Sequence, residues 1–209
     1  MATRTRIKIC GFTQVDAALH AAHAGADAIG LVFHPPSPRH LELANARAIV
    51  QALPAFVSSV ALFVDAAVDV VQTVIEQVRP DLLQFHGDET PAYCRQFNRP
   101  YIKAVRVRVG LDLLQYASRF DDARGLLLDT FVSGEAGGTG LSFDWRLIPP
   151  VLSLPLILSG GLSSANVGAA IQQIRPWAVD VSSGVEISKG IKDAAKVAQF
   201  IAEVRNAGR

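Results

Sequence analysis

The chain has 209 residues, half of them apolar, which suffices for one well-buried core. This length is at the short end for a complete eight-fold α/β barrel, and we expect one domain spanning residues 1–209. Twenty basic and 19 acidic residues are spread along the chain and leave a formal charge of +1. Because no basic stripe is present to displace counterions from a polyphosphate backbone, nucleic acid is not an expected partner.

The cysteines and the apolar runs indicate in which cellular compartment the protein is expected. Cys10 and Cys94 form neither a CxxC pair nor a disulfide-rich pattern, and residues 1–4 lack the apolar segment of a secretory signal. The longest apolar runs have the length of strands, well short of the roughly 18 residues that a membrane span needs. We therefore expect a cytoplasmic protein with reduced cysteines and no membrane partner.

Short apolar, β-branched runs alternate with segments of helical period, as is typical of repeated βα units around a parallel sheet. Nearly continuous apolar runs suit parallel strands that are covered on both faces. Eight candidate strands follow in chain order: Ile7 to Cys10, Ala28 to Phe33, Val57 to Val64, Leu82 to Phe85, Tyr101 to Val107, Gly125 to Asp129, Leu156 to Ser159 and Ala178 to Val181. Eight units favour an α/β fold closed as a (β/α)8 TIM barrel ringed by helices. An open doubly wound sheet is the alternative, but it usually has fewer strands and a glycine-rich phosphate loop after the first one.

Between the strands, apolar residues recur at i, i+3, i+4 and i+7, which gives a helix one apolar face. The pattern occurs in segments 15–22, 68–78, 167–174 and 194–201. Thr13 and Asp16 have the spacing of a capping box, which predicts the start of the first helix. A glycine-rich stretch at 132–140, after the sixth strand, is expected to form a mobile βα loop.

In this type of barrel the active site is built at the carboxyl ends of the strands. Cys10 ends the first candidate strand and Asp129 the sixth. A thiol near a helix N-terminus can be held as a thiolate, although a buried cysteine is often only a small apolar side chain. A carboxylate ending an apolar strand is costly unless it has partners or its pKa rises, and a raised pKa suits a general acid. The alternative for Asp129 is a helix cap or a salt bridge.

Other polar residues follow strand ends or lie on helices. Arg39 lies in a proline-braced loop after the second strand, where its guanidinium suits a carboxylate or a phosphate or is simply solvated. His86, after the fourth strand, is either a hydrogen-bond donor beside a substrate or a loop residue pairing with Asp88. His20 and His23 lie on a helix without partners in ligand spacing, so we expect them on the surface and expect no metal site.

Two glycine-containing segments follow the last two strands: Ser159-Gly160-Gly161-Leu162 and Ser182-Ser183-Gly184-Val185-Glu186. The loops after strands seven and eight frequently bind phosphate in these barrels. Glycine lets backbone N–H groups approach an anion, and a helix start adds its dipole. Either segment alone reads as a plain turn, but the two together predict a phosphate site.

Eight motifs occur in order between residue 7 and about residue 193: Lys8-Ile9-Cys10-Gly11, Ser37-Pro38-Arg39, Gln84-Phe85-His86-Gly87, Leu128-Asp129-Thr130, Gly137-Gly138-Thr139-Gly140, Phe143-Asp144-Trp145, Ser159-Gly160-Gly161-Leu162 and Asp180-Val181-Ser182-Ser183-Gly184-Val185-Glu186. The combination is far more specific than any one motif. Together they resemble the phosphoribosylanthranilate isomerase family.

The resemblance implies an Amadori rearrangement in tryptophan biosynthesis, which converts N-(5'-phosphoribosyl)anthranilate into the 1-deoxyribulose 5-phosphate derivative without a cofactor. It implies that Asp129 is the general acid that opens the ribose ring and that Cys10 is the general base that removes the C2' proton. Arg39 would hold the anthranilate carboxylate, with His86 and Asp180 lining the pocket. The phosphate would lie against Gly140, Gly161, Ser183 and Gly184. A small-molecule substrate is thus the expected partner, bound by a monomer or a homodimer.

Two positions depart from the family pattern. Phe85 stands where Leu is common, and Leu141 stands where a Lys often follows the glycine-rich loop, which leaves one charge contact to the phosphate in question.

Two other functions stay open. A related histidine-pathway isomerase resembles this chain in its phosphate loops but has an aspartate where Cys10 stands. A non-catalytic barrel that binds phosphorylated metabolites would not need both Cys10 and Asp129 at strand ends.

Overall fold

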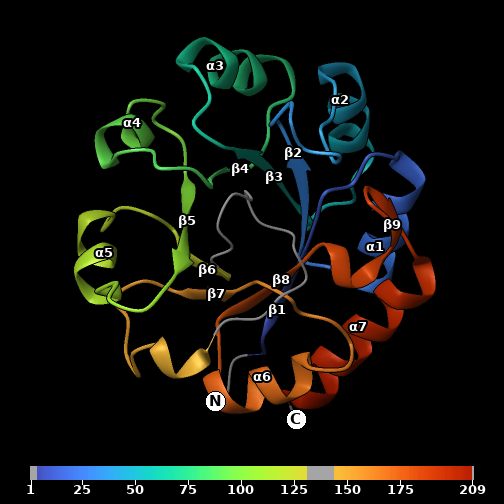
Figure 1. The fold of residues 1–209 in the computed structure, drawn as a ribbon. Helices are drawn as coiled ribbons and strands as arrows, with labels where there is room; N and C mark the ends of the chain where they lie inside the picture. The colour runs from blue at the N-terminus through green and yellow to red at the C-terminus, as the bar shows by residue number, and fades with distance from the viewer. Residues whose placement is uncertain (1–3, 131–143, 209) are drawn as a thin grey trace.

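Eight parallel strands close into a barrel at the centre of the molecule (Figure 1). The computed structural model describes residues 4–130 and 144–208. Each strand pairs with the next along the chain, and β1 pairs with β8 to complete the ring. The strands are β1 (Arg6–Cys10), β2 (Ala28–Val32), β3 (Ser58–Phe63), β4 (Leu82–Phe85), β5 (Tyr101–Val107), β6 (Leu126–Thr130), β7 (Leu156–Leu158) and β8 (Ala178–Val181). The closed barrel confirms the expected fold class and rules out the open sheet.

Alternate side chains of each strand face either the helices or the barrel interior, because successive residues of a strand point to opposite faces. On β1, Ile7 and Ile9 belong to the large apolar core that includes the inner faces of the helices. Lys8 and Cys10 therefore face inward. A smaller apolar cluster fills the interior and consists of Val60, Ile102, Ala104, Leu127, Ile157 and Ala178. Polar side chains lie beyond this apolar cluster, at the carboxyl ends of the strands.

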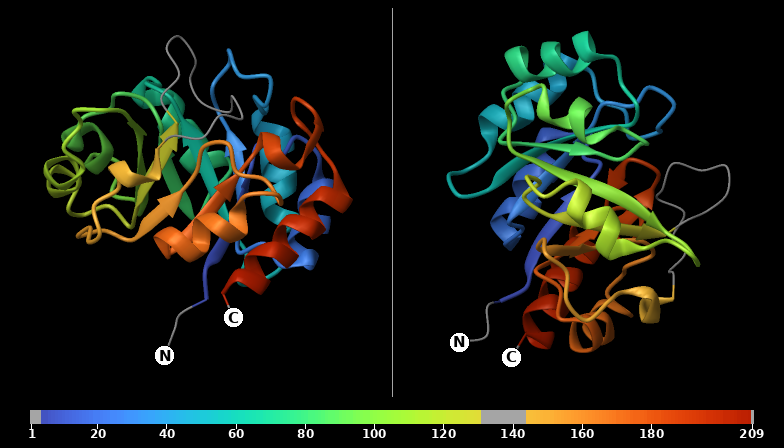
Figure 2. Two further views of the ribbon diagram at one scale, coloured as in Figure 1. Left: turned by 60° about the horizontal axis from the view of Figure 1, so that its bottom comes forward. Right: turned by 90° about the vertical axis from the view of Figure 1, so that its left-hand side faces the viewer.

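Helices surround the barrel (Figure 2). They are α1 (Val15–Ala24), α2 (Leu43–Ala52), α3 (Val68–Gln77), α4 (Pro91–Arg95), α5 (Leu113–Arg119), α6 (Val167–Ile174) and α7 (Ala194–Ala207), with short 3₁₀ turns η1 (Trp145–Leu147) and η2 (Ser183–Val185). The four segments of helical period coincide with α1, α3, α6 and α7. His20 and His23 lie on the exposed side of α1, as expected. Within the described residues, no helix is long and apolar enough to cross a membrane.

The start of α1 differs from the expected capping box. Gln14 is the N-cap residue, and no side-chain hydrogen bond caps the helix. The Thr13 hydroxyl instead donates to the carbonyl oxygen of Gly190 at 2.8 Å. Thr13 lies one residue before the N-cap. Its hydrogen bond joins the loop after β1 to a turn 177 residues further along the chain. Asp16 still lies in the first turn, where its charge suits the helix dipole.

A small antiparallel ribbon follows β8 and is not among the elements expected from the sequence. It consists of β9 (Glu186–Ser188) and β10 (Ile191–Lys192). Gly190, with a φ of +85°, lies in the turn between them, and a Cβ there would lie 3.0 Å from the carbonyl oxygen of Pro38. The ribbon therefore packs against the loop after β2. It carries Glu186 and Lys192 toward the mouth of the barrel.

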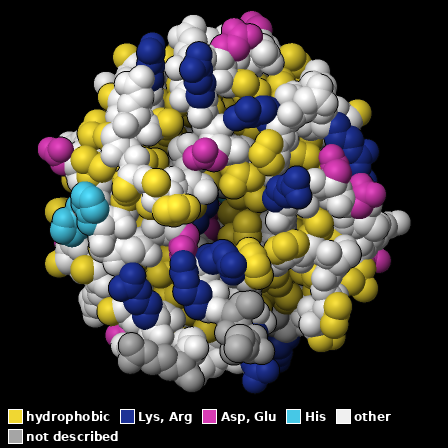
Figure 3. All heavy atoms as spheres, turned by 180° about the vertical axis from the view of Figure 1, so that it is seen from behind, with side chains coloured by type: hydrophobic (Ala, Val, Ile, Leu, Met, Phe, Trp, Pro, Cys, Tyr) yellow, Lys and Arg dark blue, Asp and Glu magenta, His cyan; other side chains and the backbone are white. Residues whose placement is uncertain are grey.

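The surface seen from behind Figure 1 is mixed in charge (Figure 3). Lysine and arginine side chains lie there among aspartate and glutamate side chains, with apolar side chains between them. On this face, the described residues form no continuous basic stripe of the kind that follows a nucleic-acid backbone.

Candidate active site

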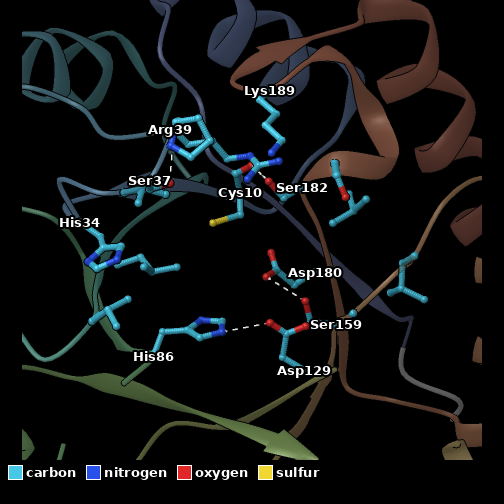
Figure 4. A pocket seen from close by; sticks show the side chains of 18 of the residues that line it. Cys10, His34, Ser37, Arg39, His86, Asp129, Ser159, Asp180, Ser182 and Lys189 are labelled. Carbon is cyan, nitrogen blue, oxygen red and sulfur yellow. Dashed lines mark hydrogen bonds and ion pairs between the residues drawn. The ribbon is translucent and has the colours of Figure 1, made fainter. Parts of the chain in front are cut away.

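A cavity of about 410 Å³ opens at the carboxyl ends of the strands (Figure 4). Its volume lies in the usual range of small-molecule sites, roughly 300–1,000 Å³. The cavity brings together seven of the residues singled out in the sequence: Cys10, Arg39, His86, Asp129, Gly161, Asp180 and Ser183. Gly184 follows in the same loop as Ser183, whereas Gly140 lies outside the described residues. In the part of the chain that is described, no three His, Cys, Asp or Glu side chains cluster as metal ligands.

Cys10 stands at the end of β1 with its sulfur pointing into the cavity (Figure 4). The residue is only 6% exposed. Gly30 on the neighbouring strand β2 makes room for it, because a Cβ at Gly30 would lie 2.6 Å from the Cys10 Sγ. Burial raises the pKa of the thiol, Asp180 raises it further, and the charges of Lys8 and Lys192 act in the opposite direction. The pKa of the thiol is raised overall, so formation of the thiolate depends on the cations around it.

Lys8 and Asp180 form a buried ion pair inside the barrel. Lys8 Nζ donates to Asp180 Oδ1 at 2.8 Å. The two residues are partners in the register of β1 and β8, so the closing seam of the barrel sets this contact. Ser159 Oγ, at the end of β7, donates to Asp180 Oδ2 at 3.4 Å. Asp180 is thus held from two sides at the cavity wall.

Asp129, at the carboxyl end of β6, contacts His86 in the cavity wall (Figure 4). Asp129 Oδ2 lies 3.0 Å from His86 Nε2, and His86 Nδ1 lies 2.9 Å from Gln84 Nε2. When the Gln84 amide donates to Nδ1, Nε2 carries the ring hydrogen and donates to the carboxylate. His86 therefore pairs with Asp129 instead of Asp88. Asp129 is buried in this contact and does not cap a helix.

Arg39 is anchored in a buried network and is not a solvated loop arginine. Its Nε and Nη2 donate to the Glu186 carboxylate at 2.8 and 2.7 Å. Lys192 Nζ donates to the same carboxylate at 2.7 Å. The hydrogen bonds to Glu186 raise the pKa of Arg39 and keep it charged. One edge of the guanidinium is thereby occupied, and the other edge, made by Nη1 and Nη2, retains donors for a planar anion in the cavity.

The loops after β7 and β8 pack tightly against each other beside the cavity. Gly160 and Gly161 have φ values of +84° and +65°, which residues with a Cβ rarely adopt. Their backbone N–H groups have no acceptor among the described residues. Asn166 Nδ2 donates to the Gly161 carbonyl at 2.8 Å and holds the first loop in place. A Cβ at Gly184 would overlap the carbonyl oxygen of Leu162, so only glycine permits this approach.

The sequence reasoning missed four polar residues of this site, namely Lys8, Gln84, Glu186 and Lys192. Lys8 could have been found, because it lies two residues before Cys10 and a strand places both on one face. Glu186 is the last residue of the motif that begins at Asp180, but no local pattern marks it as a partner of Arg39, which lies 147 residues earlier. Lys192 has no signal at all before the β9–β10 ribbon is known.

The comparisons with known proteins agree on one family. The family model described as N-(5'-phosphoribosyl)anthranilate (PRA) isomerase matches residues 7–203. The N-(5'-phosphoribosyl)anthranilate isomerase of Nitrosospira multiformis is 60% identical over 196 residues, which cover 94% of each chain. The crystal structure of phosphoribosylanthranilate isomerase from Thermotoga maritima has a TM-score of 0.89 and 38% identity, with 97% of this chain and 99% of that chain covered. A phosphoribosylanthranilate isomerase in complex with reduced 1-(o-carboxyphenylamino)-1-deoxyribulose 5-phosphate has a TM-score of 0.85, with the same identity and coverage. This chain therefore belongs to the N-(5'-phosphoribosyl)anthranilate isomerase family.

Proposed function

We propose that this enzyme converts N-(5'-phosphoribosyl)anthranilate into 1-(2-carboxyphenylamino)-1-deoxyribulose 5-phosphate, an Amadori rearrangement of tryptophan biosynthesis, by acid–base catalysis without a cofactor. The observation that carries the proposal is the meeting of a thiol and a carboxyl group, Cys10 and Asp129, in one cavity of about 410 Å³. The identity of the substrate is inferred from the family to which the chain belongs. The relative in complex with a reduced 1-(o-carboxyphenylamino)-1-deoxyribulose 5-phosphate supports the same product class.

The reaction begins with proton transfer from the Asp129 carboxylic acid to the ring oxygen of the ribose. The ring opens, and the resulting iminium ion acidifies the hydrogen at C2'. The Cys10 thiolate removes that hydrogen and becomes a thiol, which leaves an enolamine that tautomerises to the ketone. Asp129 has lost one proton and Cys10 has gained one, so a proton returned from thiol to carboxylate restores the enzyme. His86 holds the Asp129 carboxyl group in place through a contact of 3.0 Å between Nε2 and Oδ2.

The remaining residues bind the two ends of the substrate. Arg39 offers the free edge of its guanidinium to the anthranilate carboxylate, and the apolar wall of Val32 and Leu62 suits the aromatic ring. His86 and Asp180 line the middle of the site. The phosphate would lie on the backbone donors and hydroxyl of the loops after β7 and β8, with contributions from Gly140, Gly161, Ser183 and Gly184.

The decisive experiment mixes the purified protein with freshly made phosphoribosylanthranilate and follows the loss of its anthranilate fluorescence. We expect Cys10→Ser and Asp129→Asn each to lower kcat by on the order of 10² or more, with an unchanged circular dichroism spectrum. Cys94→Ala is the matched control, because Cys94 is buried in α4 away from the cavity and its loss leaves kcat unchanged. Near wild-type turnover of Cys10→Ser or Asp129→Asn would remove the acid–base assignment. Turnover of a histidine-pathway substrate alone would favour that isomerase instead.

The proposal includes a setting for the enzyme. We place it in the cytoplasm, where two free cysteines stay reduced, with the small-molecule substrate as its partner. A Thermotoga maritima relative is described as dimeric. This chain would act as a monomer or a homodimer, and sedimentation equilibrium distinguishes the two.

A further inference from the structure

We propose that Lys8 is the positioning residue that favours the thiolate of Cys10, through an ammonium group that pairs with Asp180 and shares the inner face of β1 with the thiol. The inference rests on the proposed function, because it names the group that readies the general base. Nothing in the mechanism above uses Lys8, although a fully buried lysine is costly to keep.

The strand geometry brings Lys8 to the thiol. Lys8 and Cys10 are two residues apart on β1, so both side chains face the barrel interior. Lys8 is 5% exposed, and its Nζ gives one hydrogen bond at 2.8 Å to Asp180. An ammonium group has three donors, and this ion pair uses one of them. Burial lowers the pKa of Lys8, but Asp180 and Cys10 outweigh this effect and raise it.

The alternative source of stabilisation, a helix N-terminus, is too far along the chain. Helix α1 begins at Val15, and the residues directly after Cys10 bond back to β2, where the Gly11 and Phe12 amides both donate to the Gly30 carbonyl. The effect of a helix dipole falls off within its first turn. A cation on the same strand as the thiol is therefore the more direct stabiliser.

Charges of both signs surround the thiol, and burial leaves its pKa raised overall. The charged and titratable groups facing it are Lys8 of β1, Asp180 of β8, Lys192 of β10 with its partner Glu186, Lys189 of the turn between β9 and β10, Arg39 and His34 of the loop after β2, and the pair His86 and Asp129. Burial and Asp180 raise the pKa of the thiol, whereas the charges of Lys8 and Lys192 lower it. Among the neighbouring charges, Lys8 has the largest effect on the pKa of the thiol, and this effect favours the thiolate.

The test measures the thiolate directly, without turnover. The rate of Cys10 alkylation by iodoacetamide is followed against pH, with the modified residue identified by mass spectrometry. In Lys8→Met we expect the thiolate fraction at neutral pH to fall about tenfold or more, since a neighbouring opposite charge shifts a pKa by about one unit or more. The acid limb of the pH profile of kcat/KM moves to higher pH by about one unit, which corresponds to the same tenfold change. Lys8→Arg keeps the charge and restores much of the thiolate.

Removal of Lys8 alone leaves Asp180 buried without its cation, so a second comparison guards against misfolding. Asp180→Asn is compared with the double variant Lys8→Met/Asp180→Asn, in which neither buried charge remains. We expect a lower thiolate fraction in the double variant. The control is Lys103→Met/Glu89→Gln, which removes another fully buried pair, with its Nζ–Oε2 distance of 3.0 Å, outside the cavity. Its alkylation profile stays that of the wild type.

Identical alkylation profiles in Asp180→Asn and Lys8→Met/Asp180→Asn would overturn the role of Lys8. This outcome is distinct from a failure of the proposed function. If Cys10→Ser retained wild-type turnover, Cys10 would not be the base, yet the alkylation result on Lys8 would still stand or fall by itself.

Discussion

Glu186 holds two buried cations at once, and its neutralisation tests how much this network contributes to the fold. The residue is 7% exposed and accepts hydrogen bonds from Arg39 Nε and Nη2 at 2.8 and 2.7 Å and from Lys192 Nζ at 2.7 Å. Glu186→Gln keeps the shape but removes the charge and turns an amide N–H toward donors. Because an uncompensated buried charge costs about 3–5 kcal/mol, we expect the free energy of unfolding to fall by about 3 kcal/mol.

The pH dependence of this loss has a defined sign. Burial raises the pKa of Glu186, but the hydrogen bonds from Arg39 and Lys192 outweigh burial and leave the pKa below its ordinary value of 4.5. A carboxyl group with a lowered pKa stabilises the fold fully above its unfolded pKa, and this contribution disappears as the pH falls through the folded pKa. The stability difference between wild type and Glu186→Gln is therefore largest at neutral pH and shrinks below pH 4.5.

Urea unfolding followed by circular dichroism, at neutral pH and below pH 4.5, measures both effects. Asp121→Asn is the matched control, since the exposed Arg95–Asp121 pair at 2.8 Å is screened by solvent and contributes little to stability. The double variant Glu186→Gln/Lys192→Met removes one of the two stranded cations and recovers part of the loss. If Glu186→Gln were no less stable than Asp121→Asn, the reasoning from desolvated charges would be refuted.

Three further substitutions probe the cavity. Arg39→Ala raises KM about tenfold or more with little change in kcat, because it removes a binding charge, and an unchanged KM in steady-state kinetics excludes Arg39 from carboxylate binding. Gly30→Ala places a Cβ 2.6 Å from the Cys10 sulfur and displaces the base, so kcat falls on the order of 10²-fold, and wild-type kcat contradicts this packing. Gly184→Ala pushes against the Leu162 carbonyl and separates the two phosphate loops. It weakens competitive inhibition by inorganic phosphate, and an unchanged inhibition constant argues against a phosphate site there.

Much of the fold was readable from local patterns. The apolar runs are strands because a parallel strand is covered on both faces, and all eight expected strands are present with ends that shift by about one residue, such as β6, which begins at Leu126 instead of Gly125. The candidate site followed from one further rule, since the carboxyl ends of parallel strands meet at one mouth. Cys10 and Asp129 therefore line the same cavity although 118 residues of chain lie between them.

Only the closed tertiary structure decided which partner each polar group has. Arg39 meets Glu186 across 147 residues, and Lys8 meets Asp180 across 172, because the ring closes with β1 beside β8 in one register. The Thr13 hydroxyl bonds to a distant turn in place of its own helix for the same reason. Hydrophobic periodicity is a property of residues close together in the sequence, so the sequence alone predicts the strands and helices. The pairing of buried charges depends on which strand edges close together, and no local pattern encodes that.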